Sequence, residues 1–262
     1  MRGFVWMVRF IPMYGVMILI GIFAAAGVAW MLVKHFKYDP NHLLLLIAYG
    51  FLGGMVGAKL LFLLISWNQI EWSSILDPEY LKLLMSGGFV FYGGLIGGLG
   101  AVFLAGRLHK IHVLPYLEAA IPCLPIAHAF GRIGCHFASC CYGFPYNGPF
   151  HVIYHQSPYV PTYAPLETPL FPVQMLEALI NFGIAAVLIR RTWKKGLSLL
   201  NVYIYLMLYG ISRFLLEFLR YDDAERGGLL WFSTSQWISM IMILVSAFLM
   251  TRSMVKQKEK GQ

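Results

Sequence analysis

Long apolar stretches dominate this chain of 262 residues and constrain its fold more than any other feature. Seven can be read, each near the roughly 20 residues that a helix needs to cross a bilayer: about 14–33, 43–67, 87–105, 114–133, 173–189, 199–219 and 236–250. They are continuously apolar rather than alternating, which argues against a membrane β-barrel. We therefore expect an all-α integral membrane protein, a bundle of seven transmembrane helices in which residues 1–262 form a single polytopic domain.

The composition supports this fold class. Hydrophobic residues make up 59% of the chain and charged residues only 12%, whereas about 25% of a soluble domain is charged. A soluble enzyme, a disordered tail and a repeat solenoid are excluded. The first stretch is long for the apolar core of a signal peptide, so we interpret it as a mature helix.

The net charge of +8 has two interpretations, a nucleic-acid surface or cytoplasmic anchoring of a membrane protein. No basic patch is interleaved with aromatic residues, so no nucleic-acid partner is expected. With seven spans, twelve basic residues fall on one side of the membrane: Lys34, Lys37, Arg107, Lys110, Arg190, Arg191, Lys194, Lys195, Arg252, Lys256, Lys258 and Lys260. Five fall on the other: Arg2, Arg9, Lys82, Arg220 and Arg226.

This charge asymmetry predicts the orientation, because basic loops stay in the cytoplasm. The N-terminus is then outside and the C-terminus is cytoplasmic, with a short tail over about 252–262. The longest connection, about 134–172, is an extracytoplasmic loop, and so is the segment 68–86. Within the latter, residues 68–82 have the mixed composition of an interfacial amphipathic piece.

Ionisable residues interrupt the apolar spans. An arginine at the centre of a membrane helix costs about 2.5–3.5 kcal/mol on insertion scales, so such residues are rare and often functional. The structural alternative is that they snorkel to the interface or pair with one another. Six lie within or at the ends of spans: Lys59, Glu118, Arg132, Glu177, Arg213 and Glu217.

Two polar stripes follow from helical spacing. Tyr209, Arg213 and Glu217 are four residues apart and share one face, as do His128 and Arg132. Facing each other, the stripes would enclose a polar cavity, and two arginines there suit a phosphate group. Alternatively, Arg213 and Glu217 only neutralise each other.

Glycines and a neighbouring aromatic residue mark the third span. Gly93 and Gly94 follow Tyr92 directly. Small residues usually permit close helix packing. The alternative is that the pair breaks the helix and exposes backbone to a lipid headgroup.

Five motifs together resemble a known family. Gly131-Arg132-Ile133-Gly134-Cys135-His136-Phe137 resembles the GRxGNF signature of prolipoprotein diacylglyceryl transferases. The others, in matching order over most of the chain, are Tyr14-Gly15, Gly88-Phe89-Val90-Phe91-Tyr92-Gly93-Gly94, Pro172-Val173-Gln174-Met175-Leu176-Glu177, and the segment 209–220.

The resemblance implies an activity. Members of the family transfer the diacylglyceryl group of phosphatidylglycerol to the lipobox cysteine thiol of pre-lipoproteins, forming a thioether and releasing glycerol phosphate. The implied location is the bacterial cytoplasmic membrane, with the site facing the outer leaflet and no cofactor required. A related lipid transferase with a different acceptor, and less so a small transporter, are the alternatives.

The resemblance also implies site residues. The family's essential arginines correspond to Arg132 and Arg213, which we expect to bind the phosphodiester and stabilise the leaving phosphate. With them, the expected catalytic residues are Arg132, Arg213, Tyr92 and His128. The expected substrate-binding residues are Tyr14, Gly93, Gly94, Gly131, Cys135, Gln174, Glu177, Tyr209 and Glu217.

Two positions depart from the family pattern. Tyr92 replaces a histidine that has been proposed as the base for the thiol, and Cys135 replaces an asparagine. A tyrosine, with an ordinary pKa near 10, is a poor base at neutral pH. We therefore expect Tyr92 to donate a hydrogen bond to phosphate or glycerol, and His128 or His136 to act as the base.

Three cysteines follow the GRxG motif closely, at positions 135, 140 and 141. They have three interpretations: small half-buried side chains at a tight interface, a disulfide of Cys140 or Cys141 with Cys135 or Cys123, or metal binding together with His136. The spacing C-x4-C-C lacks the paired C-x2-C of ordinary zinc sites, so no metal site is expected.

Overall fold

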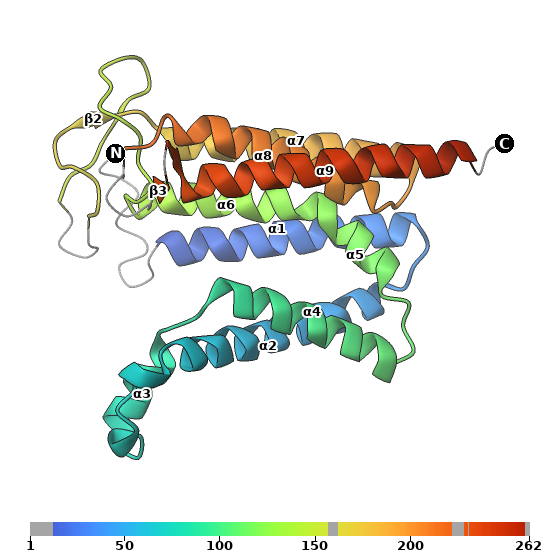
Figure 1. Cartoon of the computed structure of the whole chain (residues 1–262), viewed down its shortest axis with the longest axis horizontal. Helices are drawn as coiled ribbons and strands as arrows, with labels where there is room; N and C mark the ends of the chain where they lie inside the picture. Colours follow the sequence, from blue (N-terminus) through green and yellow to red (C-terminus); the bar gives the residue numbers. More distant parts are fainter. Residues whose placement is uncertain (1–12, 157–161, 222–227, 230, 260–262) are drawn as a thin grey trace. The chain divides into compact units, whose positions relative to one another are not determined.

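The apolar stretches form helices, as the sequence predicts. A computed structural model describes residues 13–156, 162–221, 228–229 and 231–259 (Figure 1). Its α-helices are α1 Met13–His35, α2 Pro40–Ile65, α3 Pro78–Ser86, α4 Phe91–Leu108, α5 Leu114–Ala120, α6 Leu124–Phe137, α7 Val173–Lys195, α8 Leu200–Glu217 and α9 Thr234–Glu259. Short 3-10 turns are η1 Trp67–Gln69, η2 Trp72–Ser74 and η3 Ile121–Cys123.

Two short antiparallel strand pairs complete the described structure. β1 (Val152–Ile153) pairs with β2 (Pro169–Leu170), and β3 (Gly228–Leu229) pairs with β4 (Phe232–Ser233). Both pairs lie in connections between helices, so the protein is all-α in class.

Five helices are long and apolar enough to cross a membrane: α1, α2, α4, α7, and α9 over Thr234–Ser253. This supports a multi-pass helical membrane protein. The sequence predicted two further spans, 114–133 and 199–219, which correspond to the α5–α6 region and to α8. The count of seven therefore stays a prediction.

The predicted span 114–133 is wrong as a single helix. The structure divides this region into α5, the 3-10 turn η3 and α6. Pro122 lies in η3 and Pro125 in the first turn of α6. Proline has no N–H to donate and its ring clashes with the preceding turn, which interrupts a continuous α-helix.

The helices divide between two compact units, Met1–Leu32 with Leu117–Gln262, and Val33–Tyr116. In the first unit, α6 packs on α7, α7 on α8, and α8 on α9, and these helices run side by side (Figure 1). α1 approaches α6 closely, since a Cβ added at Gly134 would lie 3.0 Å from Tyr14 Cδ2. The unit thus brings the GRxG motif of α6 beside α7 and close to the start of α1.

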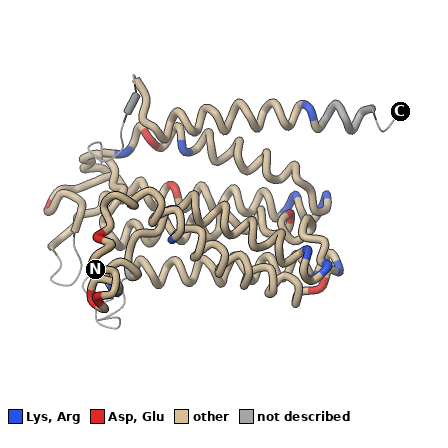
Figure 2. Tube along the Cα trace, turned by 60° about the horizontal axis from the view of Figure 1, so that its bottom comes forward, with Lys and Arg blue, Asp and Glu red and all other residues tan. Residues whose placement is uncertain are grey.

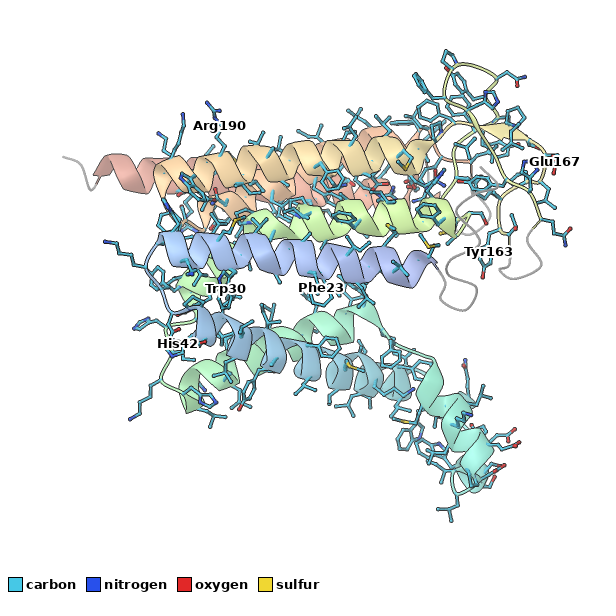
Figure 3. All side chains as sticks on the ribbon, turned by 180° about the vertical axis from the view of Figure 1, so that it is seen from behind. Phe23, Trp30, His42, Tyr163, Glu167 and Arg190 are labelled. Atoms are coloured by element: carbon cyan, nitrogen blue, oxygen red, sulfur yellow. The ribbon has the colours of Figure 1, made fainter. Side chains whose placement is uncertain are left out.

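Charged residues are rare along the helices and lie mostly near their ends (Figure 2). At the end of α7, Asn201 Nδ2 donates to Thr192 Oγ1 at 2.8 Å, and both side chains are fully buried. Figure 3 shows Arg190 near this end and Tyr163 and Glu167 in the connection at the other. The first unit therefore has a basic end and a looped end.

In the second unit, α2 and α4 pack through glycines. A Cβ added at Gly97 would lie 2.8 Å from Gly57 Cα. α4 runs unbroken from Phe91, and a Cβ on Gly93 would lie 2.6 Å from Leu61 Cβ. The alternative in which Gly93 and Gly94 break the helix is wrong, because close packing on α2 accounts for them.

Lys59 has a structural role in the second unit. Its ammonium donates to the carbonyl oxygens of Leu84 and Gly87, the latter at 2.7 Å. It also lies 4.8 Å from the centre of the Phe62 ring. The lysine thus supplies hydrogen bonds to carbonyls at the end of α3, where intrahelical donors are missing.

Candidate functional site

A buried ion pair joins α6 to α7. Arg132 Nε lies 3.0 Å from Glu177 Oε1, and the two side chains are 14% and 4% exposed. The contact has the distance of an ion pair without satisfying hydrogen-bond geometry. Removing a charge from such a buried pair would leave its partner uncompensated in an apolar surrounding.

A second buried ion pair lies within α8. Arg213 NH2 is 2.9 Å from Glu217 Oε2, at i,i+4 spacing, and 3.2 Å from Ser235 Oγ. Ser233 Oγ donates to Glu217 Oε1 at 2.7 Å. Arg213 and Glu217 thus form the ion pair that their spacing predicts, and Ser233 at the end of β4 and Ser235 in the first turn of α9 each contribute a hydroxyl group to it.

The first turn of α9 is held by a capping box that touches this pair. Gln236 N donates to Ser233 Oγ at 3.2 Å, while Ser233 N donates to Gln236 Oε1 at 3.0 Å. This reciprocal arrangement satisfies two backbone donors at a helix start. Ser233 therefore has two roles: it fixes the start of α9, and it orients the carboxylate of Glu217.

The two predicted polar stripes do face each other. The His128 and Tyr209 rings lie 4.9 Å apart between centroids. Arg132 and Arg213 both lie close enough to Tyr209 for their positive charges to act on its phenol. The two guanidinium groups thus both lie near one tyrosine inside the first unit.

One donor of this site has no partner. Arg213 NH1 is fully buried and makes no hydrogen bond within the part of the chain that the structure describes. A buried charged donor without an acceptor costs more than the roughly 1–3 kcal/mol of a neutral one. An anionic oxygen placed there would remove that cost.

A polar chain links α7 to the looped end. Gln174 Nε2 donates to the Cys140 carbonyl at 2.8 Å and to the Tyr154 hydroxyl at 3.3 Å. The Tyr154 hydroxyl lies 3.2 Å from His136 Nδ1. Burial raises the pKa of Tyr154 to about 12, so it stays a neutral phenol that can donate to His136.

The three clustered cysteines lie beside this chain. Cys135, Cys140 and Cys141 are free thiols, half-buried, with their sulfur atoms all within 4.8 Å of one another. Cys123, the other predicted disulfide partner, is a buried free thiol that donates to the Ala119 carbonyl. None of the four forms a disulfide, so that interpretation is not supported.

The structure brings most of the predicted site residues into the first unit. Around the two ion pairs lie Arg132, Arg213, His128, Glu177, Tyr209 and Glu217. Cys135 belongs to the cysteine cluster, Tyr14 and Gln174 lie near it, and Gly131 is one turn earlier on α6. Tyr92, Gly93 and Gly94 lie in the first turns of α4, in the second unit. Their part in catalysis or binding stays a prediction.

Several polar residues of the site were not predicted. Ser233 and Ser235 stand at the start of the last apolar stretch, where the pattern Ser-x-x-Gln is a signal for a capping box. Tyr154 and Ser139 belong to a connection without periodicity. Their contacts depend on how that connection folds back, which no local pattern records.

Comparisons with known proteins agree with the motifs. Residues 5–252 match the family model described as prolipoprotein diacylglyceryl transferase. A phosphatidylglycerol–prolipoprotein diacylglyceryl transferase of Clostridium tetani is 36% identical over 235 residues, covering 90% of each chain. Another, numbered 2, of Clostridium perfringens is 30% identical and covers 95% of this chain and 94% of its own. One of Leptospira interrogans is 28% identical over 94% of this chain and 90% of its own.

Proposed function

The chain belongs to the prolipoprotein diacylglyceryl transferase family, and from that premise we infer that it transfers a diacylglyceryl group from phosphatidylglycerol to a prolipoprotein. It is a transferase of lipoprotein biosynthesis. The acceptor atom is the thiol of the lipobox cysteine, which becomes a thioether, and the second product is glycerol phosphate.

The observation that carries the residue assignment is the buried NH1 of Arg213, which has no hydrogen-bond partner among the described residues and lies beside the balanced ion pairs. Each arginine has one glutamate, so the four side chains sum to no net charge. The glutamates also fix the directions of the two guanidinium groups, so a phosphodiester that binds there would meet donors that are already oriented. Such preorganised donors stabilise charge as it develops without reorganising at the moment of reaction.

The roles of the site residues follow from the reaction. Carbon–sulfur bond formation requires a thiolate, and the carbon–oxygen bond to phosphate breaks with its electron pair going to the leaving glycerol phosphate. Arg132 and Arg213 are the donors to that phosphate. Tyr209, near both arginines, orients the Arg132 guanidinium, and His128, whose ring contacts Tyr209, accepts the thiol proton.

The location follows from the orientation we propose: seven spans, with the N-terminus outside and the C-terminus in the cytoplasm. The basic end of α7, with Arg190 and Lys194, would face the cytoplasm. The connection after α6 would then be extracytoplasmic, and the site would face the outer leaflet of a bacterial cytoplasmic membrane. Lipobox peptides would reach it from that side, and nucleic acid has no part.

A matched set of arginine variants tests the assignment. We expect Arg213→Ala and Arg132→Ala to lower thioether formation on a lipobox peptide, supplied with phosphatidylglycerol in detergent, by at least about 100- to 1000-fold. Arg190→Ala is the control, because Arg190 lies near the other end of α7 (Figure 3). Undiminished transfer in both site variants would overturn the assignment.

A conservative variant separates chemistry from folding. Arg213→Lys keeps a cation beside Glu217 but loses the planar pair of donors that binds phosphate oxygens. We expect thermal unfolding of this variant near that of the unchanged protein, with a rate still far below it. Full activity in Arg213→Lys would show that a point charge is sufficient.

A further inference from the structure

Cys135, Cys140 and Cys141 form a cluster that the proposed transfer does not use. All three thiols are free and half-buried, and their sulfur atoms lie within 4.8 Å of one another. Three thiolates bound to one tetrahedral zinc ion at about 2.3 Å would be about 3.8 Å apart. Small side-chain movements would therefore bring the sulfur atoms to binding distance.

The fold holds this cluster in place on several sides. Cys140 N donates to the Cys135 carbonyl at 3.1 Å, which turns the chain back over the end of α6. Ser139 and Cys141 have φ angles of 52° and 55°, in the left-handed region that costs non-glycine residues free energy. Gln174, from α7, binds the Cys140 carbonyl at 2.8 Å.

Ser139 ties the cluster to the following connection. Its hydroxyl accepts from the backbone N–H of Tyr163 at 3.0 Å, and the serine is only 5% exposed. The cluster is thus held by a backbone hydrogen bond at the end of α6, by the Gln174 side chain of α7 and by the Ser139 hydroxyl, which binds the following loop. This arrangement exists without a disulfide to maintain it.

We propose that Cys135, Cys140 and Cys141 bind one thiophilic cation, with Zn²⁺ as the reference ion, through three sulfur atoms. Soft thiolate ligands select zinc over hard cations such as Mg²⁺ or Ca²⁺. Three thiolates and one Zn²⁺ carry a net charge of −1. The positive charges that act on Cys141 are those of Arg220 and of Arg132, the latter already paired with Glu177.

Three protein ligands leave one tetrahedral position open, as in catalytic rather than structural zinc sites. His136 is adjacent in sequence, but the group of ligand atoms that lie together contains the three cysteines and not this histidine. The open position therefore suits an external ligand, and a thiol is the one that such an ion prefers. This step rests on the proposed function, whose acceptor is a cysteine thiol.

The step balances in atoms and electrons. A thiol that binds the ion loses its proton, to His128 or to water, and is held as the thiolate. Its sulfur then forms the bond to the glycerol carbon while the carbon–oxygen bond to phosphate breaks, and the electron pair leaves with glycerol phosphate. Binding of the acceptor thiol to the ion would thus generate the thiolate. This matters in a chain that has Tyr92 where the family has the histidine proposed as the base.

Zinc content of the purified full-length protein tests the site. After loading with Zn²⁺ and desalting, we expect about one zinc ion per chain, and a higher melting temperature than in the chelated protein. Cys140→Ser and Cys135→Ser should lose at least tenfold in zinc affinity and lose the thermal shift. Cys123→Ser is the matched control, because Cys123 lies outside the cluster on η3, and it should keep both.

Two outcomes would overturn the metal site. Equal zinc content in the unchanged protein and in both cluster variants would show that other groups bind it. Alkylation of the freshly purified, denatured protein that finds two cluster thiols oxidised, with no zinc taken up after reduction, would identify a disulfide pair instead.

Cobalt substitution tests the open position. We expect the visible spectrum of the Co²⁺-loaded protein to change when a cysteine lipobox peptide is added, but not when its serine analogue is added. Identical Co²⁺ spectra with the cysteine peptide and with its serine analogue would overturn coordination of the acceptor thiol. Undiminished thioether formation by the zinc-free protein would also overturn it and leave the transferase proposal intact, since that proposal fails only if the zinc-loaded protein forms no thioether.

Discussion

At the scale of single residues, the notable property of the site is that each buried arginine is neutralised by one buried glutamate. Arg132 faces Glu177 and Arg213 faces Glu217, and each carboxylate is almost completely buried. Buried pairs of this kind contribute little net stability, because the cost of desolvating both charges offsets their attraction. Their use here is to hold guanidinium groups at fixed directions in an apolar interior.

The balance predicts a strong effect when one charge is removed. Glu177→Gln leaves the Arg132 guanidinium buried without an anion, so we expect the free energy of unfolding to fall by about 3–5 kcal/mol. Thermal unfolding in detergent, with circular dichroism as the signal, measures it. Glu167→Gln is the control, since that carboxylate contacts His155 at the surface with both side chains 70% exposed.

Adding Arg132→Met to Glu177→Gln sharpens this test. The double variant removes both charges, so it should regain much of the stability that Glu177→Gln loses. Equal stability of Glu177→Gln and the unchanged protein would contradict the assignment of a buried pair.

At the scale of elements, glycine spacing sets how closely α2 and α4 approach. The added Cβ at Gly97 would meet backbone of α2, with Gly57 Cα at 2.8 Å, whereas nothing lies within 4 Å of one at Gly100. Without a hydrophobic driving force between membrane helices, such close backbone packing drives their association. The two glycines are therefore not equivalent although both lie on α4.

This difference gives a paired prediction. Alanine favours a helix over glycine by about 1 kcal/mol, so Gly100→Ala should preserve or slightly raise the melting temperature. Gly97→Ala gains the same propensity but forces the two helices apart, so it should lower the melting temperature. Both are measured by thermal unfolding in the same detergent, and equal shifts would show that this contact does not limit stability.

At the scale of the whole molecule, charge asymmetry predicts which loops face the cytoplasm. A protease site inserted after Phe150, which is 90% exposed, should be cleaved in intact spheroplasts. One inserted after Gly196, between α7 and α8, should be cleaved only after the membrane is opened. Immunoblots of the fragments give the readout, and the reversed pattern would invert the proposed orientation.

Much of this architecture follows from the order of amino acids along the chain. A run of apolar residues makes a helix whatever its partners, because burial in lipid and internal backbone bonding depend only on neighbouring residues. For the same reason the i,i+4 pair of Arg213 and Glu217 was readable from spacing alone. The motif around Arg132 indicated the protein family, and the family in turn indicated the reaction.

Contacts between distant segments were not readable in this way. Glu177 pairs with Arg132 only because α7 packs on α6, and Ser233 reaches Glu217 only because α9 begins beside the end of α8. The three cysteine sulfur atoms meet because the chain turns back at Ser139. Periodicity describes one face of one element, whereas these contacts depend on the packing of several, so they required the folded structure.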